Sequence, residues 1–377
     1  MFIPYSRQNI QNDDISAVCA ALEDDIITCG KRVDEFERAL CEYIGVKFAV
    51  VMNSATSALH AGYLALGLSQ NDEIITSPIT FAATANAAIM CGADVRWAGV
   101  DEYSGNIDIS SIQSLINPRT KIIVPVDFGG LSVDMDEILS LAKKHNLLVL
   151  DDASHALGST YKGVKVGKKA NASVFSFHAI KPITTLEGGA LLTDDEQIAK
   201  KARLIRSHGI SKKELWDSDI SVLGYNYRLS DVACALGLSQ LKKLDSFIAK
   251  REQIALYYDS ELCKEPFNEL LDLIKIPNNL TSSRHLYPIK LAPHLRAHKA
   301  EIFTKLQKAG IGAQVHYKPS YEFSFYRQKY GTINIPSAKN FYESELSLPC
   351  HQLMSQEDAN FIISTLKSVL AQFKAKF

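Results

Sequence analysis

The sequence predicts an α/β fold built on a parallel sheet, followed by a smaller α+β domain. Between about residues 47 and 193, short β-branched runs alternate with helical stretches, as in a parallel sheet covered on both faces. The chain also has 377 residues, more than one small core needs, which favours two domains. We place the boundary within long helices near residue 245, giving a large domain of residues 1–245 and a small domain of residues 246–377.

Local patterns predict the elements in order. Two helices, residues 14–23 and 33–43, precede the sheet, and an Asn-Asp pair before the first suits helix capping. The expected strands are residues 48–52, 73–76, 94–97, 121–126, 147–151, 173–177 and 189–193. Apolar positions near a 3.6-residue period predict helices at 56–66, 81–90 and 135–145. After a polar loop at 210–223, the pattern predicts long helices over 230–263, a strand at 287–291, a helix at 298–309, a strand at 313–317 and a helix at 356–373.

Composition and charge exclude several classes of protein. Lys plus Arg number 41 and Asp plus Glu 42, so a net charge of −1 provides no field for binding nucleic acid or an anionic membrane. The sequence has no secretory leader pattern and no long apolar run, and we expect a cytoplasmic protein without a membrane partner. The seven cysteines are scattered, and we expect them to be reduced and mostly buried. No metal is expected, because His294 and His298 lack the glutamate of a helical zinc site.

Small and hydroxyl residues follow the first expected strand. The run Asn-Ser-Ala-Thr-Ser-Ala at 53–58 lies where a strand ends and a helix begins. Small side chains there let a ligand approach the free N–H groups at the positive end of the helix, which suits one phosphate. An ordinary helix cap explains the same residues without a ligand. The glycine-rich signatures of dinucleotide and P-loop sites are absent.

Charged side chains follow two further expected strands. Asp151 and Asp152 lie at the strand edge where open α/β sheets bind ligands. Because successive residues of a strand face opposite sides, only one of these carboxylates can point in a given direction. Lys181 follows the next strand. Taken singly, Lys181 is equally explained as a solvated surface lysine and Asp152 as a turn carboxylate.

The lysine, the carboxylate and the phosphate cradle together suit pyridoxal 5'-phosphate chemistry. A lysine amine forms an imine with the cofactor aldehyde, and a carboxylate keeps the pyridine nitrogen protonated. The helix N-terminus and Ser176 bind the phosphate. We therefore expect pyridoxal 5'-phosphate as the cofactor.

Three motifs resemble those of the DegT/DnrJ/StrS family of sugar-nucleotide aminotransferases. They are Asp-Asp-Ala-Ser-His-Ala at 151–156, Ser-Phe-His-x-x-Lys at 176–181 with Glu-Gly-Gly at 187–189, and Gly-Tyr-Asn-Tyr-Arg at 224–228. The resemblance extends from Tyr5 to residue 351, nearly the whole chain. It implies the fold type I of pyridoxal phosphate-dependent transferases, with a mostly parallel central sheet in the large domain. Asp151 departs from the glutamate usual in the family.

The resemblance implies roles for individual residues. Lys181 is the Schiff-base lysine that also moves the proton, Asp152 contacts the pyridine nitrogen, and His155 lies near the ring. The other implied cofactor contacts are Ala55, Thr56, Phe81, Ser176 and Asn226. Of these, Asn226 would come from the neighbouring subunit of a homodimer with shared active sites.

The same resemblance implies a UDP-linked 4-keto-6-deoxy sugar as substrate and L-glutamate as amino donor. Several stretches resemble the branch that makes an N-acetyl-altrosamine for pseudaminic acid. The implied substrate contacts are Tyr5, Asp25, Ile26, Ile27, Thr28, Ser54, Lys181, Asn226, Gln314, Val315, His316 and Tyr317. Packing of Tyr5 against the first helix, and of His316 and Tyr317 within a strand, are the structural alternatives.

Other functions fit the same residues. An aminotransferase for a different UDP- or dTDP-4-keto-6-deoxy sugar would use the same cofactor site. A non-catalytic regulatory protein could retain the fold. The dehydratase branch of the family replaces the lysine with histidine, so the presence of Lys181 argues against it. A desulfurase would need a cysteine on a mobile loop, and none of the scattered cysteines fits.

Overall fold

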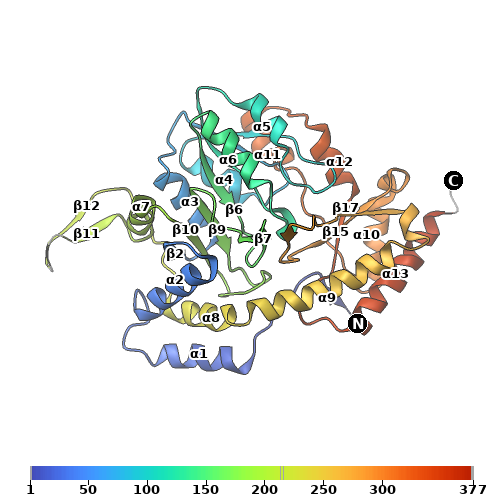
Figure 1. The fold of residues 1–377 in the computed structure, drawn as a ribbon, viewed down its shortest axis with the longest axis horizontal. Coiled ribbons are helices and arrows are strands. Elements are labelled where there is room, and N and C mark those ends of the chain that lie inside the picture. Colours follow the sequence, from blue (N-terminus) through green and yellow to red (C-terminus); the bar gives the residue numbers. More distant parts are fainter. Residues whose placement is uncertain (1, 213, 215, 375–377) are drawn as a thin grey trace.

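A seven-stranded sheet lies at the centre of the large domain (Figure 1). The computed structural model describes residues 2–212, 214 and 216–374. The strands are β2 (Phe48–Met52), β3 (Glu73–Thr76), β4 (Asp94–Trp97), β5 (Thr120–Val124), β6 (Leu148–Asp152), β9 (Ala172–Ser176) and β10 (Gly189–Thr193), in the order β2-β10-β9-β6-β5-β3-β4. Only β10 runs antiparallel to its neighbours. The predicted mostly parallel sheet is confirmed.

Alternate residues of the strands pack against helices on opposite faces of the sheet. On β2, Val50 and Met52 join the core formed with α3 (Ala55–Ala65), α4 (Ala83–Met90) and α7 (Glu196–Arg206). Ala49 and Val51 face α2 (Lys31–Ile44) and α8 (Asp231–Leu241) instead. Further along the sheet, α5 (Ile109–Leu115) and α6 (Met135–Lys144) cover β3, β5 and β6. Burial on both faces explains why consecutive residues of these strands are apolar, as in residues 48–52 of β2 and 122–124 of β5.

The first helix, α1 (Asn12–Leu22), begins before the predicted residue 14, so the Asn-Asp pair lies inside it rather than capping it. The carboxylate of Asp14 accepts the backbone N–H of Gln11 at 2.8 Å and so satisfies one exposed donor of the first turn. Asp14 also accepts hydrogen bonds from Ser239 and Gln240 of α8, at 2.7 and 2.8 Å. The cap therefore also docks α1 onto the large domain.

One long helix, α9 (Leu244–Leu262), connects the two parts of the chain (Figure 1). Its first turn packs in the core of the large domain, and its last two turns pack in a separate apolar core. That second core surrounds a three-stranded sheet of β13 (Leu271–Leu273), β15 (Tyr287–Leu291) and β17 (Glu345–Leu348), with α10 (Lys299–Lys308) and α13 (Gln356–Lys374). The domain boundary at residue 245 stays a prediction.

The predicted strand at 313–317 is wrong. The strand here is β16 (Ile311–Gly312), which pairs with β1 (Ile3–Pro4) near the N-terminus. Beyond it, Gln314 forms one isolated bridge to Ser347. The backbone N–H of His316 then bonds to the side chain of Glu345, at 2.7 Å, instead of to a strand. The pairing with β17 ends after Gln314 because the side chain of Glu345, and not a backbone carbonyl, accepts the N–H of His316.

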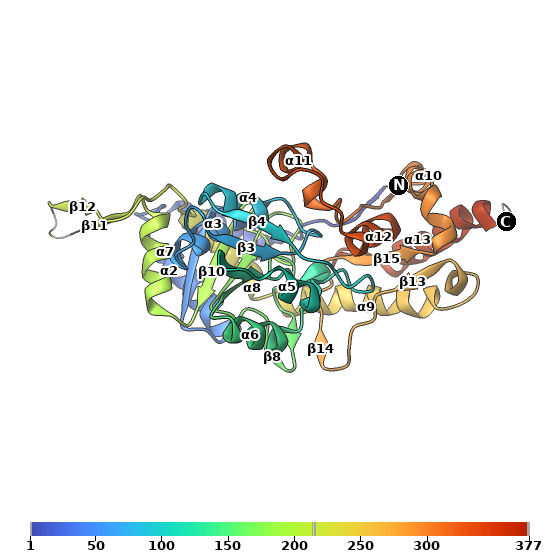
Figure 2. The same cartoon turned by 90° about the horizontal axis from the view of Figure 1, so that it is seen from above.

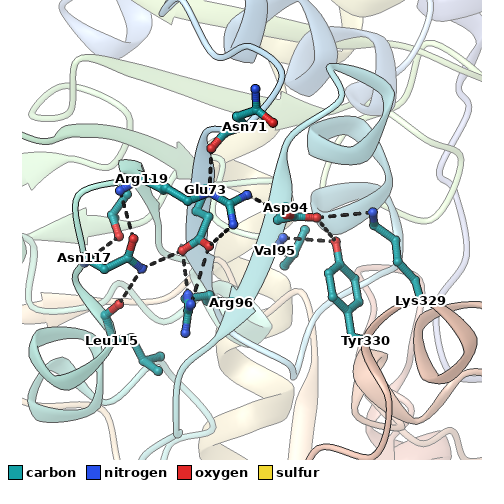
Figure 3. A network of polar contacts seen from close by, with 11 residues as sticks. Asn71, Glu73, Asp94, Val95, Arg96, Leu115, Asn117, Arg119, Lys329 and Tyr330 are labelled. Carbon is teal, nitrogen blue, oxygen red and sulfur yellow. Dashed lines mark hydrogen bonds and ion pairs between the residues drawn. The ribbon is translucent and has the colours of Figure 1, made fainter.

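Part of the expected small domain packs back onto the large sheet. Helix α11 (Ser324–Tyr330) lies beside β4, and α12 (Pro336–Ser344) lies beside β15 (Figure 2). Trp97 of β4 makes edge-to-face contacts with Tyr321, Tyr326 and Tyr330. Lys329 pairs with Asp94 at 3.2 Å (Figure 3). Aromatic packing and an ion pair thus attach this segment to β4, the edge strand of the large sheet.

Two further predictions need correction. Residues 210–223 are not only a loop, because β11 (Ile210–Lys212) and β12 (Ser218–Ile220) form a hairpin that extends away from the molecule (Figures 1 and 2). Of the seven cysteines only Cys234 and Cys350 are buried, so the expectation of mostly buried cysteines is wrong. Cys19 and Cys263 lie at exposed positions of α1 and after α9.

The remaining elements are small. Strands β14 (Leu280–Thr281), β7 (Thr160–Tyr161) and β8 (Val164–Lys165) form a separate three-stranded sheet. Short 3-10 helices lie at Phe128–Gly130, Phe267–Glu269, Pro293–His298 and Ser320–Glu322. Among the helices that the structure describes, none is long and apolar enough to cross a bilayer.

Candidate active site

The carboxyl ends of β2, β6 and β9 meet at one edge of the sheet. Gly189, the first residue of β10, pairs with both Met52 and Ser176, so it brings the ends of β2 and β9 together. A Cβ atom at Gly189 would lie 2.5 Å from the backbone nitrogen of Ala55. Only glycine therefore lets the N-terminus of α3 lie this close to Ser176.

The N-terminus of α3 has the features of a phosphate site. Ser54 caps the helix, because its Oγ accepts the backbone N–H of Ser57 at 3.0 Å. The capping alternative is thus correct for Ser54. The N–H groups of Ala55 and Thr56 begin the helix and have no acceptor within it. Together with the hydroxyl of Ser176 across Gly189, these donors fit one phosphate.

Asp152 is held by two hydroxyl groups. Thr84 donates to its Oδ2 at 2.7 Å and Ser154 donates to its Oδ1 at 2.6 Å. The side chain is buried, with 4% of its surface exposed. A buried carboxylate anchored in this way can accept a further hydrogen bond from a pyridinium N–H.

Asp151 lies in a different environment. It is buried, and its Oδ1 has no hydrogen-bond partner among the residues that the structure describes. Burial raises its pKa well above the usual value, and the nearby charges of Asp127 and Asp152 raise it further. Burial and the charge of Asp152 raise the pKa of Asp127 to about 7. The structure thus distinguishes the two adjacent aspartates: two hydroxyl groups anchor Asp152, whereas Oδ1 of Asp151 is buried without a partner in the described part of the chain.

Lys181 follows β9 on a short loop at the same edge. Its Nζ lies 3.4 Å from Nε2 of His285. Burial lowers the pKa of Lys181 to about 7, and the charge of Asp152 opposes this shift. Near neutral pH a substantial fraction of the amine is unprotonated, as a nucleophile or a general base requires. This environment rules out the reading of Lys181 as a solvated surface lysine.

His155 is fixed in one neutral tautomer. Its Nδ1 accepts the backbone N–H of Gly129 at 3.3 Å, so the proton lies on Nε2, which donates to the hydroxyl of Tyr317 at 3.2 Å. Burial and the charge of Lys181 hold the pKa of His155 well below its usual value. The ring contacts His285 with 4.4 Å between centroids. His155 therefore contacts two residues of the C-terminal part of the chain, His285 and Tyr317, and lies near Lys181.

The N-terminal arm and the segment after β16 also reach this edge. Ser6 donates to the backbone oxygen of Ile180 at 2.9 Å, which places the arm beside Lys181. The ring of Tyr5 lies 5.4 Å from that of His316, centroid to centroid. His316 is close enough to Lys181 for the lysine charge to lower its pKa. The packing alternatives offered for Tyr5 and His316 therefore do not describe their full environment.

Most of the other predicted site residues are exposed to solvent in the single chain. Asp25, Ile26, Ile27 and Thr28 are exposed on the loop between α1 and α2, where Thr28 bridges to Ser230. Asn226 is exposed, and its backbone oxygen accepts from Asn53 at 3.2 Å. Phe81 is 65% exposed, three residues before Thr84. Val315 packs against the core of the small domain.

Sequence reasoning missed two residues of this site. Thr84 holds Asp152, and His285 contacts both Lys181 and His155. Thr84 follows Phe81 by one helical turn, and His285 stands just before an apolar strand, which are weak signals. Among the residues described, no cluster of three or more His, Cys, Asp and Glu side chains is placed to hold a metal ion.

Comparisons with known proteins agree on one family. The DegT/DnrJ/EryC1/StrS aminotransferase family matches residues 8–367. A UDP-4-amino-4,6-dideoxy-N-acetyl-beta-L-altrosamine transaminase of Campylobacter jejuni strain 81-176 is 56% identical over 99% of this chain and 98% of its own length. The structure of Helicobacter pylori PseC, an aminotransferase involved in the biosynthesis of pseudoaminic acid, matches with a TM-score of 0.94 and 44% identity, covering 99% of this chain and 100% of PseC. The PLP form of the putative sugar aminotransferase Spr1654 from Streptococcus pneumoniae matches with a TM-score of 0.94 and 31% identity, covering 99% of this chain and 100% of Spr1654.

Proposed function

The chain belongs to the DegT/DnrJ/EryC1/StrS aminotransferase family, and we propose that it transfers an amino group from L-glutamate to C-4 of UDP-2-acetamido-2,6-dideoxy-β-L-arabino-hex-4-ulose. The products are UDP-4-amino-4,6-dideoxy-N-acetyl-β-L-altrosamine and 2-oxoglutarate, and the reaction belongs to pseudaminic acid biosynthesis. The observation that carries this proposal is the full-length identity of 56% to the Campylobacter transaminase, combined with an intact lysine and aspartate site.

The enzyme is a pyridoxal phosphate-dependent transaminase. Pyridoxal phosphate, when bound, holds the amino group between the two half-reactions and takes up the electrons released when a proton leaves the substrate carbon. The residues present fit this group. The N–H groups of Ala55 and Thr56 with the Ser176 hydroxyl suit its phosphate, Asp152 suits its ring nitrogen, and Phe81 and His155 would lie near the ring.

Lys181 acts as the proton carrier. Its amine, with a pKa near 7, accepts a proton from the α-carbon of glutamate in the first half-reaction. In the second half-reaction Lys181 returns a proton to C-4 of the sugar. Because the residue is neutral again after each cycle, one lysine serves as both base and acid, and the enzyme should show ping-pong kinetics.

We place the keto sugar against Tyr5, Ser54, Lys181 and the segment from Gln314 to Tyr317. The N-terminal arm and the segment after β16 support this placement, because both lie beside Lys181. The buried hydroxyl of Tyr317 has a raised pKa and stays protonated, so it is available as a hydrogen-bond donor.

A homodimer with shared active sites completes the proposal. Asn226 and residues 25–28 are exposed in the single chain, which supports contacts with the site of a second subunit. The projecting hairpin also carries exposed apolar side chains, with Trp216 87% exposed and Ile220 67% exposed. Such a surface fits an interface between subunits better than contact with water. A nucleotide sugar and glutamate as substrates suit a cytoplasmic enzyme.

A panel of nucleotide sugars tests the proposal. The purified enzyme is incubated with ¹⁵N-glutamate and with several UDP- and dTDP-4-keto-6-deoxy sugars, and each product is analysed by mass spectrometry and NMR. We expect ¹⁵N at C-4 of the altro-configured UDP-N-acetyl sugar. Efficient use of a gluco-configured substrate without use of the altro-configured one would overturn the substrate assignment and leave the aminotransferase activity intact.

A further inference from the structure

A buried chain of hydrogen bonds lies behind His316. The carboxylate of Glu345 accepts the backbone N–H of His316 at 2.7 Å and the hydroxyl of Ser347 at 2.6 Å. The Ser347 oxygen in turn lies 2.8 Å from Nδ1 of His316. Glu345 and Ser347 are completely buried, and His316 is 6% exposed. One carboxylate therefore holds both the backbone and, through a hydroxyl, the ring of His316.

The direction of these bonds defines the tautomer of His316. A serine hydroxyl has one hydrogen, and the hydrogen of Ser347 is used toward Glu345. The Ser347 oxygen can then only accept from the ring, so Nδ1 of His316 carries the proton. Burial, with the charge of Lys181, lowers the pKa of His316 to about 3 and keeps the ring neutral. Its Nε2 is consequently a hydrogen-bond acceptor.

Nothing in the described part of the chain donates to this acceptor. The His316 ring contacts Ser347 at Nδ1 and the aromatic rings of Tyr5 and Tyr317. The neighbouring His155 has the opposite tautomer, with its proton on Nε2. The site thus presents one imidazole that accepts and one that donates.

We propose that Glu345, acting through Ser347, is a positioning residue that fixes His316 as the Nδ1–H tautomer, so that Nε2 accepts a hydrogen bond from a hydroxyl or amide N–H of the keto sugar. This inference rests on the proposed function, which places the keto sugar beside His316. It assigns His316 a recognition task that a protonated or reversed imidazole cannot perform. It also explains why a carboxylate, which only accepts, stands at this position.

Glu345→Gln gives a directional test, because an amide offers one acceptor and one donor. The backbone N–H of His316 is a fixed donor and takes the amide oxygen. The amide NH₂ then donates to Ser347, whose hydroxyl turns its hydrogen toward Nδ1 of His316. The ring proton moves to Nε2, where it would face the donor of the sugar. Ser347→Ala is the second variant, which removes the connection and keeps Glu345.

Kinetics of the two half-reactions measure the functional consequence. We expect kcat/KM for the keto sugar to fall by roughly 10- to 100-fold in Glu345→Gln, as for a lost hydrogen bond to substrate. Ser347→Ala should lose less, about 3- to 10-fold, because no donor is turned against the substrate. The glutamate half-reaction, followed by cofactor absorbance, should change by less than about twofold in both variants. Glu343→Gln, at an exposed position of α12 paired with Lys339, is the matched control and should match wild type.

Histidine ¹⁵N NMR at pH 8 reads the tautomer directly. At this pH Glu345 is a carboxylate, since burial raises its pKa only to about 7 and the charge of Lys299 opposes the shift. His316 is assigned by the signal lost in His316→Gln. We expect the proton on Nδ1 in wild type and on Nε2 in Glu345→Gln.

A wild-type proton on Nε2 overturns the inference. Equal losses in both half-reactions, or keto-sugar kinetics within twofold of wild type in both variants, overturn it as well. Failure of the proposed function looks different: the wild-type enzyme would convert glutamate and no UDP-keto sugar, while the tautomer measurement would still give its own answer.

Discussion

Charged residues are paired at one edge of the central sheet and unpaired at the opposite edge. At the amino ends of β3 and β4, Glu73 is 2% exposed and accepts from Arg96 and Asn117, both at 2.6 Å, and pairs with Arg119 at 3.0 Å (Figure 3). Asp94 pairs with Arg119 and Lys329 in the same network. At the carboxyl ends of β6 and β9, the charge of Asp152 acts on Lys181. Lys181 nevertheless forms no ion pair with any residue that the structure describes.

The pKa values show what the difference means. Burial alone would raise the pKa of Glu73. The pKa is nevertheless lowered, by hydrogen bonds from Arg96 and Asn117 and by the charges of Arg96 and Arg119, so the folded state favours the charged form of Glu73. Burial lowers the pKa of Lys181, so the folded state disfavours its charged form. The paired edge contributes to stability, and the unpaired edge retains reactive groups at a cost in stability. Substitutions at the two edges should therefore affect different measurements.

The largest effect is expected from Lys181→Ala. This variant removes the amine that we propose as the proton carrier, so kcat should fall by about 10,000-fold or more. The free energy of unfolding of the apoenzyme at pH 7 should stay equal or rise, because the folded state lowers the pKa of the amine that is removed and so disfavours its charged form. Steady-state assays and urea unfolding measure the two quantities, with Lys200→Ala on the exposed face of α7 as control. Many turnovers by Lys181→Ala would contradict the role of this residue.

Asp152→Asn should have the next largest effect. An amide cannot hold the ring nitrogen in its protonated form, and we expect kcat to fall by roughly 100- to 1,000-fold. Asp151→Asn is the matched control, because it changes the adjacent carboxylate outside the hydroxyl pair of Thr84 and Ser154. Its kcat should remain within a few-fold of wild type. Equal losses of kcat in the two variants would show that Asp151 and Asp152 do not have separate roles, although they lie on opposite faces of β6.

Glu73→Gln should affect stability and leave kcat unchanged. Removal of the buried charge leaves Arg96 and Arg119 without a full partner, but both side chains are nearly half exposed. We therefore expect a loss of about 2 kcal/mol in the free energy of unfolding, below the cost of breaking a fully buried pair. The pKa of Glu73 is lowered in the folded state. Its contribution to stability is therefore present at neutral pH and should disappear as the pH falls through that lowered pKa.

Urea unfolding of wild type and Glu73→Gln across pH measures this difference. Glu196→Gln, in an exposed pair with Lys200, is the control. A large loss of kcat with unchanged stability in Glu73→Gln would reverse the assignment of this edge.

Lys329→Ala should have the smallest effect. The ion pair with Asp94 is partly exposed, and the attachment of α11 also depends on Trp97 and Tyr330. We expect less than about 1 kcal/mol in the free energy of unfolding and no change in kcat. Thermal unfolding at low and high salt measures this contribution. A larger loss would show that the ion pair, rather than aromatic packing, attaches this helix.

The sequence predicts an element correctly where the local pattern of apolar residues determines its structure. The strands of the large sheet contain consecutive apolar residues because both faces of the sheet are covered, and all seven strands lie within two residues of their predicted bounds. Residues 313–317 alternate polarity like a strand but end as irregular chain, because Glu345 provides an acceptor from a distant segment. The hairpin at 210–220 was not predicted, since its exposed strands lack a buried face to impose alternation.

The same distinction applies to the site. Lys181 and Asp152 are identifiable because each follows an apolar strand within a characteristic motif. Thr84 and His285 are not identifiable, since each meets its partner only through long-range packing: Thr84 is 68 residues from Asp152, and His285 is 104 residues from Lys181. The shifted pKa of Lys181 likewise depends on burial by the assembled fold.

We propose that Lys181 is the residue that holds the cofactor, and borohydride reduction tests this most directly. The purified holoenzyme is treated with borohydride, which fixes the cofactor to its lysine, and the digested protein is mapped by mass spectrometry. We expect a phosphopyridoxyl group on the peptide that contains Lys181 and no such group in Lys181→Ala. A modification at a different lysine, or the same labelling of Lys181→Ala, would contradict it.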